Sequence, residues 1–220
     1  MELTRTKITL EHNSPEWLAF RQHGIGGSDA SAVLGLNPWK SNEELWEEKI
    51  GERAPKVVCN RAVQYGKDAE ELLTALFALD FPELQVNLVK STVFSADGFM
   101  FASLDGELTE RESGRKGILE VKTADIFSSM SKERWANKIP QNYYIQILHY
   151  LIVTGYDFAV LKAQLKSEQN GSLYLQTRHY LVDAADEAVQ VDMEYLYNAE
   201  KEFWESVKKK EKPALIIAQL

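Results

Sequence analysis

The stretch GILEVKTA, residues 117–124, decides the fold. Its apolar start predicts a buried strand, and side chains two residues apart on a strand share a face. Glu120 and Lys122 therefore point the same way, while Leu119 and Val121 point to the other side. A buried carboxylate and a buried ammonium are costly unless they pair or bind a metal. These residues alone leave both possibilities open.

A second carboxylate is expected beside Glu120. In FASLDGEL, residues 101–108, Asp105 ends an apolar run and precedes Gly106. Asp-Gly is a common turn pair, but pairing of adjacent strands would place Asp105 next to Glu120. Two adjacent carboxylates repel each other, so they share a proton or bind a divalent cation. With Lys122 on the same face, the set predicts a Mg²⁺ site for phosphate chemistry.

Two further polar residues lie on apolar helical faces. Glu70 shares a stripe with Leu73 and Phe77 on the helix expected over residues 61–79. Gln146 similarly shares a face with Tyr150 on the helix expected over residues 139–154. Both side chains are therefore expected on the core side. Such a polar stripe can also be a satisfied hydrogen-bond network.

Length and composition predict one domain, residues 1–220, without a repeat or linker. A net charge of −8 argues against non-specific coating of nucleic acid, although a nuclease needs only a local basic patch. No apolar run resembles a membrane span or a signal peptide. The single cysteine, Cys59, fits a reducing cytoplasm, and without a flanking histidine we interpret it as a small buried or neutral side chain.

The order of expected elements predicts an α/β fold, with a mixed central β-sheet flanked by helices. Ser14 begins a helix, and Ser41 with Glu44 forms a capping box before another. Further helices are expected near Ser28 and over 61–79, 139–154 and 184–210. Strands are expected near 86–95, 99–104 and 117–123, followed by an antiparallel pair formed by 158–165 and 173–182.

Asp105 followed by Glu120-Val121-Lys122 resembles the Asp…Glu-x-Lys pattern of the PD-(D/E)xK nuclease superfamily, whose core is restriction-endonuclease-like. The stretch SPEWLAFRQHGIGGSDASAVLGLNPW resembles the opening motif of the YqaJ-type viral recombinase family, the family of phage lambda exonuclease. YGKDAEELL, SLDG, LEVK and YYIQILHYLIVTG follow in that family's order. The resemblance runs from about residue 14 to 155.

The resemblance implies a metal centre. Asp105 and Glu120 would hold the metal ions, with the Val121 carbonyl as a further ligand. Glu70 would be an additional acidic ligand, directly or through water. Lys122 would position or activate the attacking water.

The resemblance also implies residues around that centre. Gln146 would orient the site or the substrate, supported by Tyr150. Arg21 and Ser28 would hold the 5′-phosphate of a DNA end, which agrees with the anion-binding capacity of helix starts and arginine. GIGGS also fits a plain turn and helix cap, but not an ATP-binding P-loop. The family often has a second glutamine where this chain has Leu148, and Leu-Asp-Gly replaces Pro-Asp-Gly.

The function implied is a Mg²⁺-dependent 5′→3′ exonuclease on linear double-stranded DNA, with Mn²⁺ as a substitute. It would leave 3′ single-stranded overhangs and work with a single-strand annealing protein. By the same resemblance it would be a homo-oligomer, a trimeric ring, encoded by a phage or prophage and active in the bacterial cytoplasm. The alternatives are a Cas4-like or structure-specific nuclease, a non-catalytic DNA-end-binding module, and a small-ligand or structural protein. Cas4-like proteins typically carry iron–sulfur cysteines, and Cys59 alone cannot supply four ligands.

Overall fold

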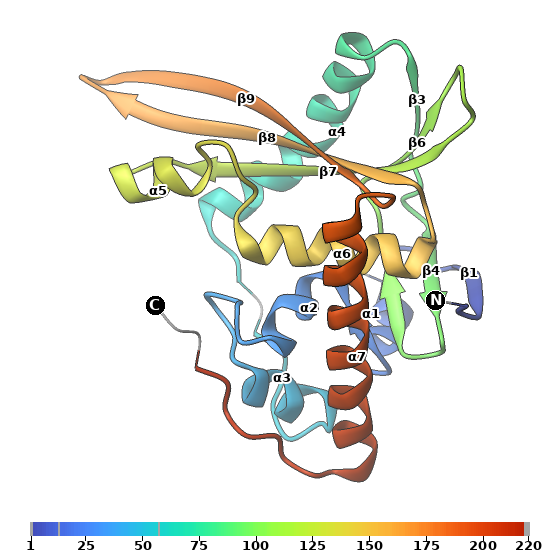
Figure 1. The fold of residues 1–220 in the computed structure, drawn as a ribbon. Coiled ribbons are helices and arrows are strands. Elements are labelled where there is room, and N and C mark those ends of the chain that lie inside the picture. Colours follow the sequence, from blue (N-terminus) through green and yellow to red (C-terminus); the bar gives the residue numbers. More distant parts are fainter. Residues whose placement is uncertain (1, 13, 57, 218–220) are drawn as a thin grey trace.

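The computed structural model describes residues 2–12, 14–56 and 58–217 (Figure 1). Its larger sheet has five strands in the order β3-β6-β7-β8-β9, and only β7 and β8 are parallel. The five strands are β3 (Leu84–Asn87), β6 (Gly106–Glu110), β7 (Lys116–Asp125), β8 (Phe158–Gln169) and β9 (Ser172–Asp183). The expected mixed sheet with flanking helices is confirmed, and GILEVKTA lies in its central strand.

A second, smaller sheet was not predicted from the sequence. It has the order β1-β4-β5-β2 and pairs the chain start with a later hairpin. Its strands are β1 (Arg5–Thr9), β4 (Thr92–Ala96), β5 (Met100–Ala102) and β2 (Ile25–Gly26). The single strand expected over 86–95 is therefore two strands in different sheets, and the strand expected over 99–104 is shorter. The alternation of apolar and polar side chains cannot reveal the break between β3 and β4, because both strands show the same alternation.

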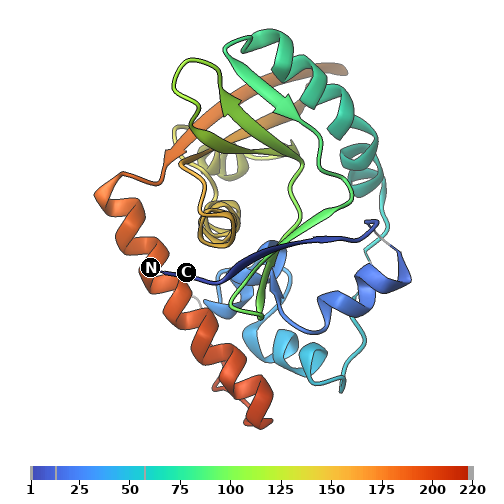
Figure 2. The ribbon, with the colours of Figure 1, turned by 90° about the vertical axis from the view of Figure 1, so that its right-hand side faces the viewer.

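Seven helices are present in the described ranges: α1 (Pro15–Arg21), α2 (Gly27–Val33), α3 (Asn42–Lys49), α4 (Arg61–Asp80), α5 (Ser129–Arg134), α6 (Gln141–Thr154) and α7 (Glu187–Lys209). α4 covers one face of the larger sheet, where Leu73 and Phe77 pack with Leu119 and Val121. α6 lies between the other face and the smaller sheet, as the turned view shows (Figure 2). Residues 145–153 of α6 are all buried, so this helix forms the centre of the core.

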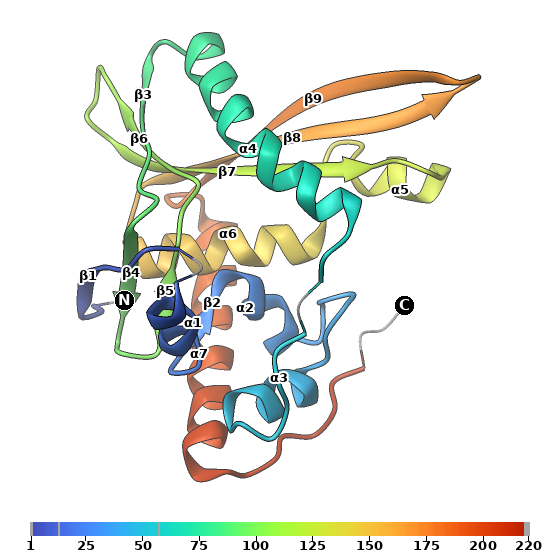
Figure 3. The same ribbon diagram turned by 180° about the vertical axis from the view of Figure 1, so that it is seen from behind.

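Local signals determine several boundaries. The Ser14 side chain caps α1, and Ser41 and Glu44 form the expected capping box of α3. Asn170 and Gly171 join β8 to β9 with φ angles of 51° and 75°, the left-handed conformation that a two-residue hairpin requires. This hairpin projects beyond the rest of the molecule in the view from behind (Figure 3). The antiparallel pairing expected for these strands is confirmed.

Two other findings concern isolated features. No helix in the described part of the chain has the length and apolar character needed to cross a bilayer. Cys59 is a free thiol on the surface, so the buried alternative considered for it is wrong.

Candidate active site

The acid and base of GILEVKTA lie on one face of β7, as alternation predicts. Lys122 Nζ donates a hydrogen bond to Glu120 Oε1. The Glu120 side chain is only 2% exposed, and that of Lys122 is 23% exposed. Leu119 and Val121 point to the opposite face and pack under α4. The ion pair expected from these two residues is therefore present, and Lys122 extends from it toward solvent.

Strand pairing brings Asp105 to the same place. Gly106 at the start of β6 pairs with Leu119 of β7, so the preceding Asp105 lies opposite Glu120. Asp105 Oδ2 accepts a hydrogen bond from the Val121 N–H at 2.8 Å. The adjacency of the two carboxylates, predicted from the sequence, is confirmed by this register.

The two carboxylates of this cluster lie on adjacent strands, with Glu120 buried and Asp105 partly buried. Burial and then the charge of Asp105 raise the pKa of Glu120 to about 8, against the opposing effect of Lys122. Burial likewise raises the pKa of Asp105. Burial would lower the pKa of Lys122, but Glu120 and Asp105 outweigh it and raise that pKa. One lysine thus faces more than one carboxylate, which is the charge imbalance that a bound cation relieves.

The donor set fits a hard divalent cation. Glu120 Oε2 is buried and has no hydrogen-bond partner, so this oxygen is free to bind a metal ion. In the ranges that the structure describes, no three His, Cys, Asp or Glu side chains gather closely enough to hold a metal by themselves. Mg²⁺ does not need three, because it commonly binds through one or two carboxylates together with water and substrate phosphate. Asp105 and Glu120 meet that requirement.

Glu70 approaches from the other face of the sheet. It is half-buried on α4, between exposed Asp68 and Glu71, as its position on the apolar stripe predicts. Burial and then the charge of Asp105 raise its pKa, so the two carboxylates influence each other. Among the described residues, no hydrogen bond joins Glu70 to the cluster. Glu70 is therefore near the Asp105–Glu120 pair but not bonded to it.

α6 supplies the next contacts. Gln146 Nε2 donates to Glu120 Oε1 at 2.7 Å and lies 2.9 Å from the Tyr150 hydroxyl. Both residues are buried, so the structure places these two sequence-predicted residues in the cluster. Leu148 is 2% exposed and packs with the apolar core. It is therefore turned away from the cluster.

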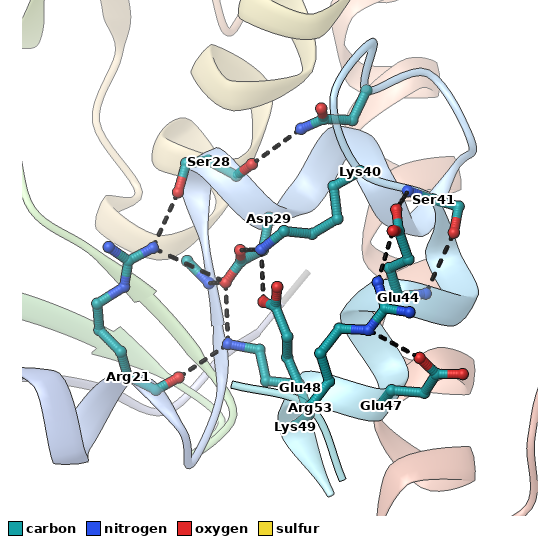
Figure 4. Close-up of polar contacts among 12 residues, drawn as sticks. Arg21, Ser28, Asp29, Lys40, Ser41, Glu44, Glu47, Glu48, Lys49 and Arg53 are labelled. Atoms are coloured by element: carbon teal, nitrogen blue, oxygen red, sulfur yellow. Dashed lines mark hydrogen bonds and ion pairs between the residues drawn. The ribbon is translucent and has the colours of Figure 1, made fainter. Parts of the chain in front are cut away.

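Arg21 and Ser28, to which the resemblance assigns the 5′-phosphate, meet at the junction of α1 and α2 (Figure 4). Arg21 Nη2 donates to Ser28 Oγ at 2.9 Å, and the Arg21 guanidinium lies over the Trp17 ring at 4.8 Å. Ser28 is exposed, so the pair is open to a ligand. A Cβ on the neighbouring Gly27 would meet the Tyr150 ring at 2.2 Å, which shows that α2 lies directly against α6. The Arg21–Ser28 pair and the carboxylate cluster are thus parts of one region.

His12 in this region was missed in the sequence analysis. Its Nε2 is buried without a hydrogen-bond partner, and its ring lies 5.6 Å from Trp17. Burial lowers its pKa, while Asp105 raises it and Arg21 lowers it, so His12 is within electrostatic range of both halves of the region. No motif or periodicity marks a histidine that precedes a helix, and only the folded chain reveals its position.

A mixed sheet with Glu-x-Lys on its central strand and an aspartate at the start of the neighbouring strand defines the PD-(D/E)xK class, with a restriction-endonuclease-like fold. The family model for the YqaJ-like viral recombinase domain matches residues 16–157. The chain belongs to this family.

Known proteins agree with that assignment. The uncharacterized protein YqaJ of Bacillus subtilis (strain 168) is 31% identical over 195 residues, which cover 88% of this chain and 56% of the relative. The chain thus spans little more than half the length of this relative. Among solved structures, an alkaline exonuclease from Laribacter hongkongensis matches with a TM-score of 0.59 and 18% identity, over 90% of this chain and 96% of that chain. A phage related exonuclease from Haemophilus somnus 129PT matches with a TM-score of 0.55 and 14% identity, over 85% and 96%. These two likenesses concern the fold.

Proposed function

We propose that the chain is a Mg²⁺-dependent exonuclease that degrades the 5′-ended strand of linear double-stranded DNA. The observation that carries the proposal is the Asp105–Glu120–Lys122 cluster, in which Glu120 Oε2 is buried without a partner. The family assignment and the exonucleases of similar fold support a nuclease. A Cas4-like enzyme is disfavoured, because one cysteine cannot hold an iron–sulfur cluster.

The roles proposed for the residues follow from their contacts. Asp105 and Glu120 would hold the metal with the Val121 carbonyl, and Glu70 would contribute from α4, through water given its place on the other face. Bound Mg²⁺ would supply a hydroxide nucleophile at neutral pH and stabilise the charge on the phosphate oxygens. Mn²⁺ would substitute, since carboxylate and carbonyl oxygens also suit that ion.

The surrounding side chains would prepare the reaction. Lys122 would orient the attacking water, because its ammonium is held by Glu120 and also reaches solvent. Gln146 would fix the Glu120 carboxylate through its 2.7 Å hydrogen bond, with Tyr150 beside its amide. A carboxylate fixed on one oxygen keeps the other free for the metal. These residues would thus set the geometry before the substrate arrives.

The direction of digestion would come from Arg21 and Ser28. An arginine and a serine hydroxyl are suited to the terminal 5′-phosphate of a DNA strand. A terminal phosphate held there would place an inner phosphodiester at the carboxylate cluster, which gives 5′→3′ digestion and a 3′ overhang. Such an overhang is the substrate of a single-strand annealing protein, which we propose as the partner in recombination.

We also propose that the enzyme works as a ring-shaped homo-oligomer, with a trimer as the expected state. An acidic chain with a net charge of −8 needs some means of retaining DNA, and enclosure provides it. Light scattering at micromolar protein concentration should give three times the chain mass. A monomeric mass would contradict the ring without affecting the nuclease assignment.

The nuclease is tested with a linear duplex labelled at either the 5′ or the 3′ end, incubated with Mg²⁺ or with EDTA. Mg²⁺-dependent release of the 5′ label is expected, and Asp105→Asn should abolish it. Asp97→Asn is the matched control, because Asp97 also precedes a glycine in a turn but contacts Thr4 and Tyr197 instead. Release from the 3′ end or nicking of circular DNA would indicate another nuclease. Binding to DNA ends without cleavage would indicate an end-binding module.

A further inference from the structure

A group of charges with a buried carboxylate at its centre lies beside Arg21 and Ser28 (Figure 4). At its centre is Asp29, in the first turn of α2, whose side chain is 5% exposed. Asp29 Oδ2 accepts from Lys49 Nζ at 2.9 Å and from the Gly26 N–H at 3.4 Å. Despite the opposing effect of burial, the nearby cations hold the pKa of Asp29 well below its usual range. Asp29 is therefore a permanent buried anion beside the anion-binding pair.

Two cations compete for the same oxygen of Asp29. Arg21 Nη2 lies 4.0 Å from Oδ2, whereas Lys49 Nζ lies 2.9 Å from it. The same Nη2 of Arg21 instead donates to Ser28 Oγ at 2.9 Å. Lys40 lies against the other oxygen, Oδ1, at 3.7 Å, and it is also paired with Glu48. Lys49 thus occupies the oxygen of Asp29 that lies nearest to the Arg21 guanidinium.

Lys49 lies where it can pair with Asp29 but has almost no contact with solvent. Its side chain is 4% exposed, so the ammonium has left water almost entirely. Its Nζ also donates to the main-chain carbonyl of Arg21 at 2.8 Å, which ties the end of α1 to α3. A buried ammonium is costly unless it is paired. Both partners of the Lys49 ammonium, the Asp29 carboxylate and the Arg21 carbonyl, lie close to the Arg21 side chain.

The group as a whole carries one positive charge in excess. Three cations, Arg21, Lys40 and Lys49, face two carboxylates, Asp29 and Glu48. Asp29 and Glu48 are both engaged by lysines at short range. The uncompensated charge therefore remains on Arg21, whose side chain is 30% exposed. An anion from solvent can reach that charge at the Arg21–Ser28 pair, because Ser28 is exposed as well.

We propose that Lys49 is a positioning residue that neutralises Asp29 and thereby keeps Arg21 free to bind the 5′-phosphate of a DNA end. The inference rests on the proposed function, since it assigns that phosphate to Arg21 and Ser28. Without Lys49, Arg21 is the nearest cation to Oδ2 and would turn from Ser28 onto the buried carboxylate. A phosphate would then have to displace an internal ion pair before it could bind.

Binding without catalysis tests this. The probe is a hairpin duplex with either a 5′-phosphate or a 5′-hydroxyl, titrated with protein in EDTA and followed by fluorescence anisotropy. Because a hydrogen bond to a charged group strengthens binding, the unmutated protein should bind the phosphorylated end about tenfold to a hundredfold more tightly than the hydroxyl end. Lys49→Met should reduce that ratio to the value of Arg21→Ala, while binding of the hydroxyl end stays unchanged.

The double variant Asp29→Asn/Lys49→Met separates positioning from folding. It removes the carboxylate that would capture Arg21 and retains the one-charge excess of the group, so the preference for phosphate should return. Lys162→Met is the matched control, because Lys162 is a fully buried lysine whose ion-pair partner is Asp80, far from α1 and α2. This control should keep the ratio of the unmutated protein.

Three results would overturn the inference. An unchanged ratio in Lys49→Met would mean that Arg21 does not need Lys49. A double variant as defective as Lys49→Met would mean that Lys49 supports the local fold and does not free Arg21. Equal binding of both ends by the unmutated protein would overturn the proposed phosphate site itself. That result is distinguishable from a failure of the Lys49 proposal, because it is seen in the protein without any substitution.

Discussion

The buried pair formed by His149 of α6 and Glu200 of α7 should be a main determinant of stability. Both side chains are fully buried, and His149 Nδ1 lies 2.8 Å from Glu200 Oε1. His149 Nε2 lies 3.0 Å from the Phe101 carbonyl oxygen on β5. Since each ring nitrogen faces an acceptor, the pair retains a proton between Nδ1 and the carboxylate. The pair thus joins three elements, one of which carries Gln146.

Glu200→Leu should break this pair at high cost. Removing one partner of a buried ion pair costs about 3–5 kcal/mol, because the other is left without compensation. For a chain of this size each kcal/mol lowers the midpoint by about 2–4 °C, so a fall of about 6–20 °C is expected. In the double variant His149→Leu/Glu200→Leu, no charge remains to be buried, and much of that loss should be recovered.

The pH dependence has a defined sign. Burial would lower the pKa of His149, but Glu200 and then the Phe101 carbonyl outweigh it and raise that pKa above the ordinary 6.5. A raised pKa gives stability that is complete below pH 6.5 and is lost as the pH rises through the folded-state value. In Glu200→Leu the largest opposing influence is lost, so burial should lower the pKa of His149 against the remaining effect of the Phe101 carbonyl, and that variant should lose stability as the pH falls. The difference between the two proteins is therefore greatest at low pH.

Urea unfolding at pH 6 and pH 9, followed by tryptophan fluorescence, measures these differences. Glu205→Leu on the same helix is the control, because the Glu205 side chain is 47% exposed and pairs with the exposed Lys208, so its loss should change the midpoint far less. The reasoning would be refuted if Glu200→Leu cost less than about 1 kcal/mol. It would also be refuted if the double variant were as unstable as the sum of the single variants.

Two further predictions concern the active site. Lys122→Ala should abolish cleavage and retain DNA binding, because it removes the group proposed to orient water and leaves Arg21 and Ser28 intact. Full activity in that variant would assign the role to another residue. Gly27→Ala should lower stability by about 1–3 kcal/mol, the usual cost of overpacking, because the new methyl would meet the Tyr150 ring at 2.2 Å. An unchanged unfolding midpoint in Gly27→Ala would show that α2 and α6 can separate without cost.

Local rules identified the parts of the site that lie close together in the sequence. Glu120 and Lys122 are two residues apart, so the strand period alone places them on one face. Asp105 follows once a neighbouring strand is assumed, and the register confirms that assumption. Gln146 follows from a helical stripe of period 3.6. Each of these inferences needs only one element or one pairing of neighbouring strands.

Contacts between distant segments lie beyond such rules. Asp29 and Lys49 are twenty residues apart, and His149 and Glu200 are fifty-one apart. Each is an ordinary charged residue in the sequence, and only the packing of one helix against another makes it buried and paired. The smaller sheet was missed for the same reason, because β1 pairs with β4 across most of the first hundred residues. Periodicity describes the face of an element and cannot identify what that face contacts.

The site residues found by local rules and those found by resemblance lie in different parts of the molecule. The larger sheet carries Asp105, Glu120 and Lys122, whereas α1 and α2, beside the smaller sheet, carry Arg21 and Ser28. Only a short link, residues 103–105, connects β5 of the smaller sheet to β6 of the larger one. Because α6 packs between the two sheets and its Tyr150 ring touches α2, a shift of either sheet must move the carboxylates relative to Arg21. The distance between the carboxylate cluster and the proposed phosphate site is therefore set by the core around α6. If the proposed function holds, substitutions in that core should alter where the DNA is cut before they alter whether it is cut.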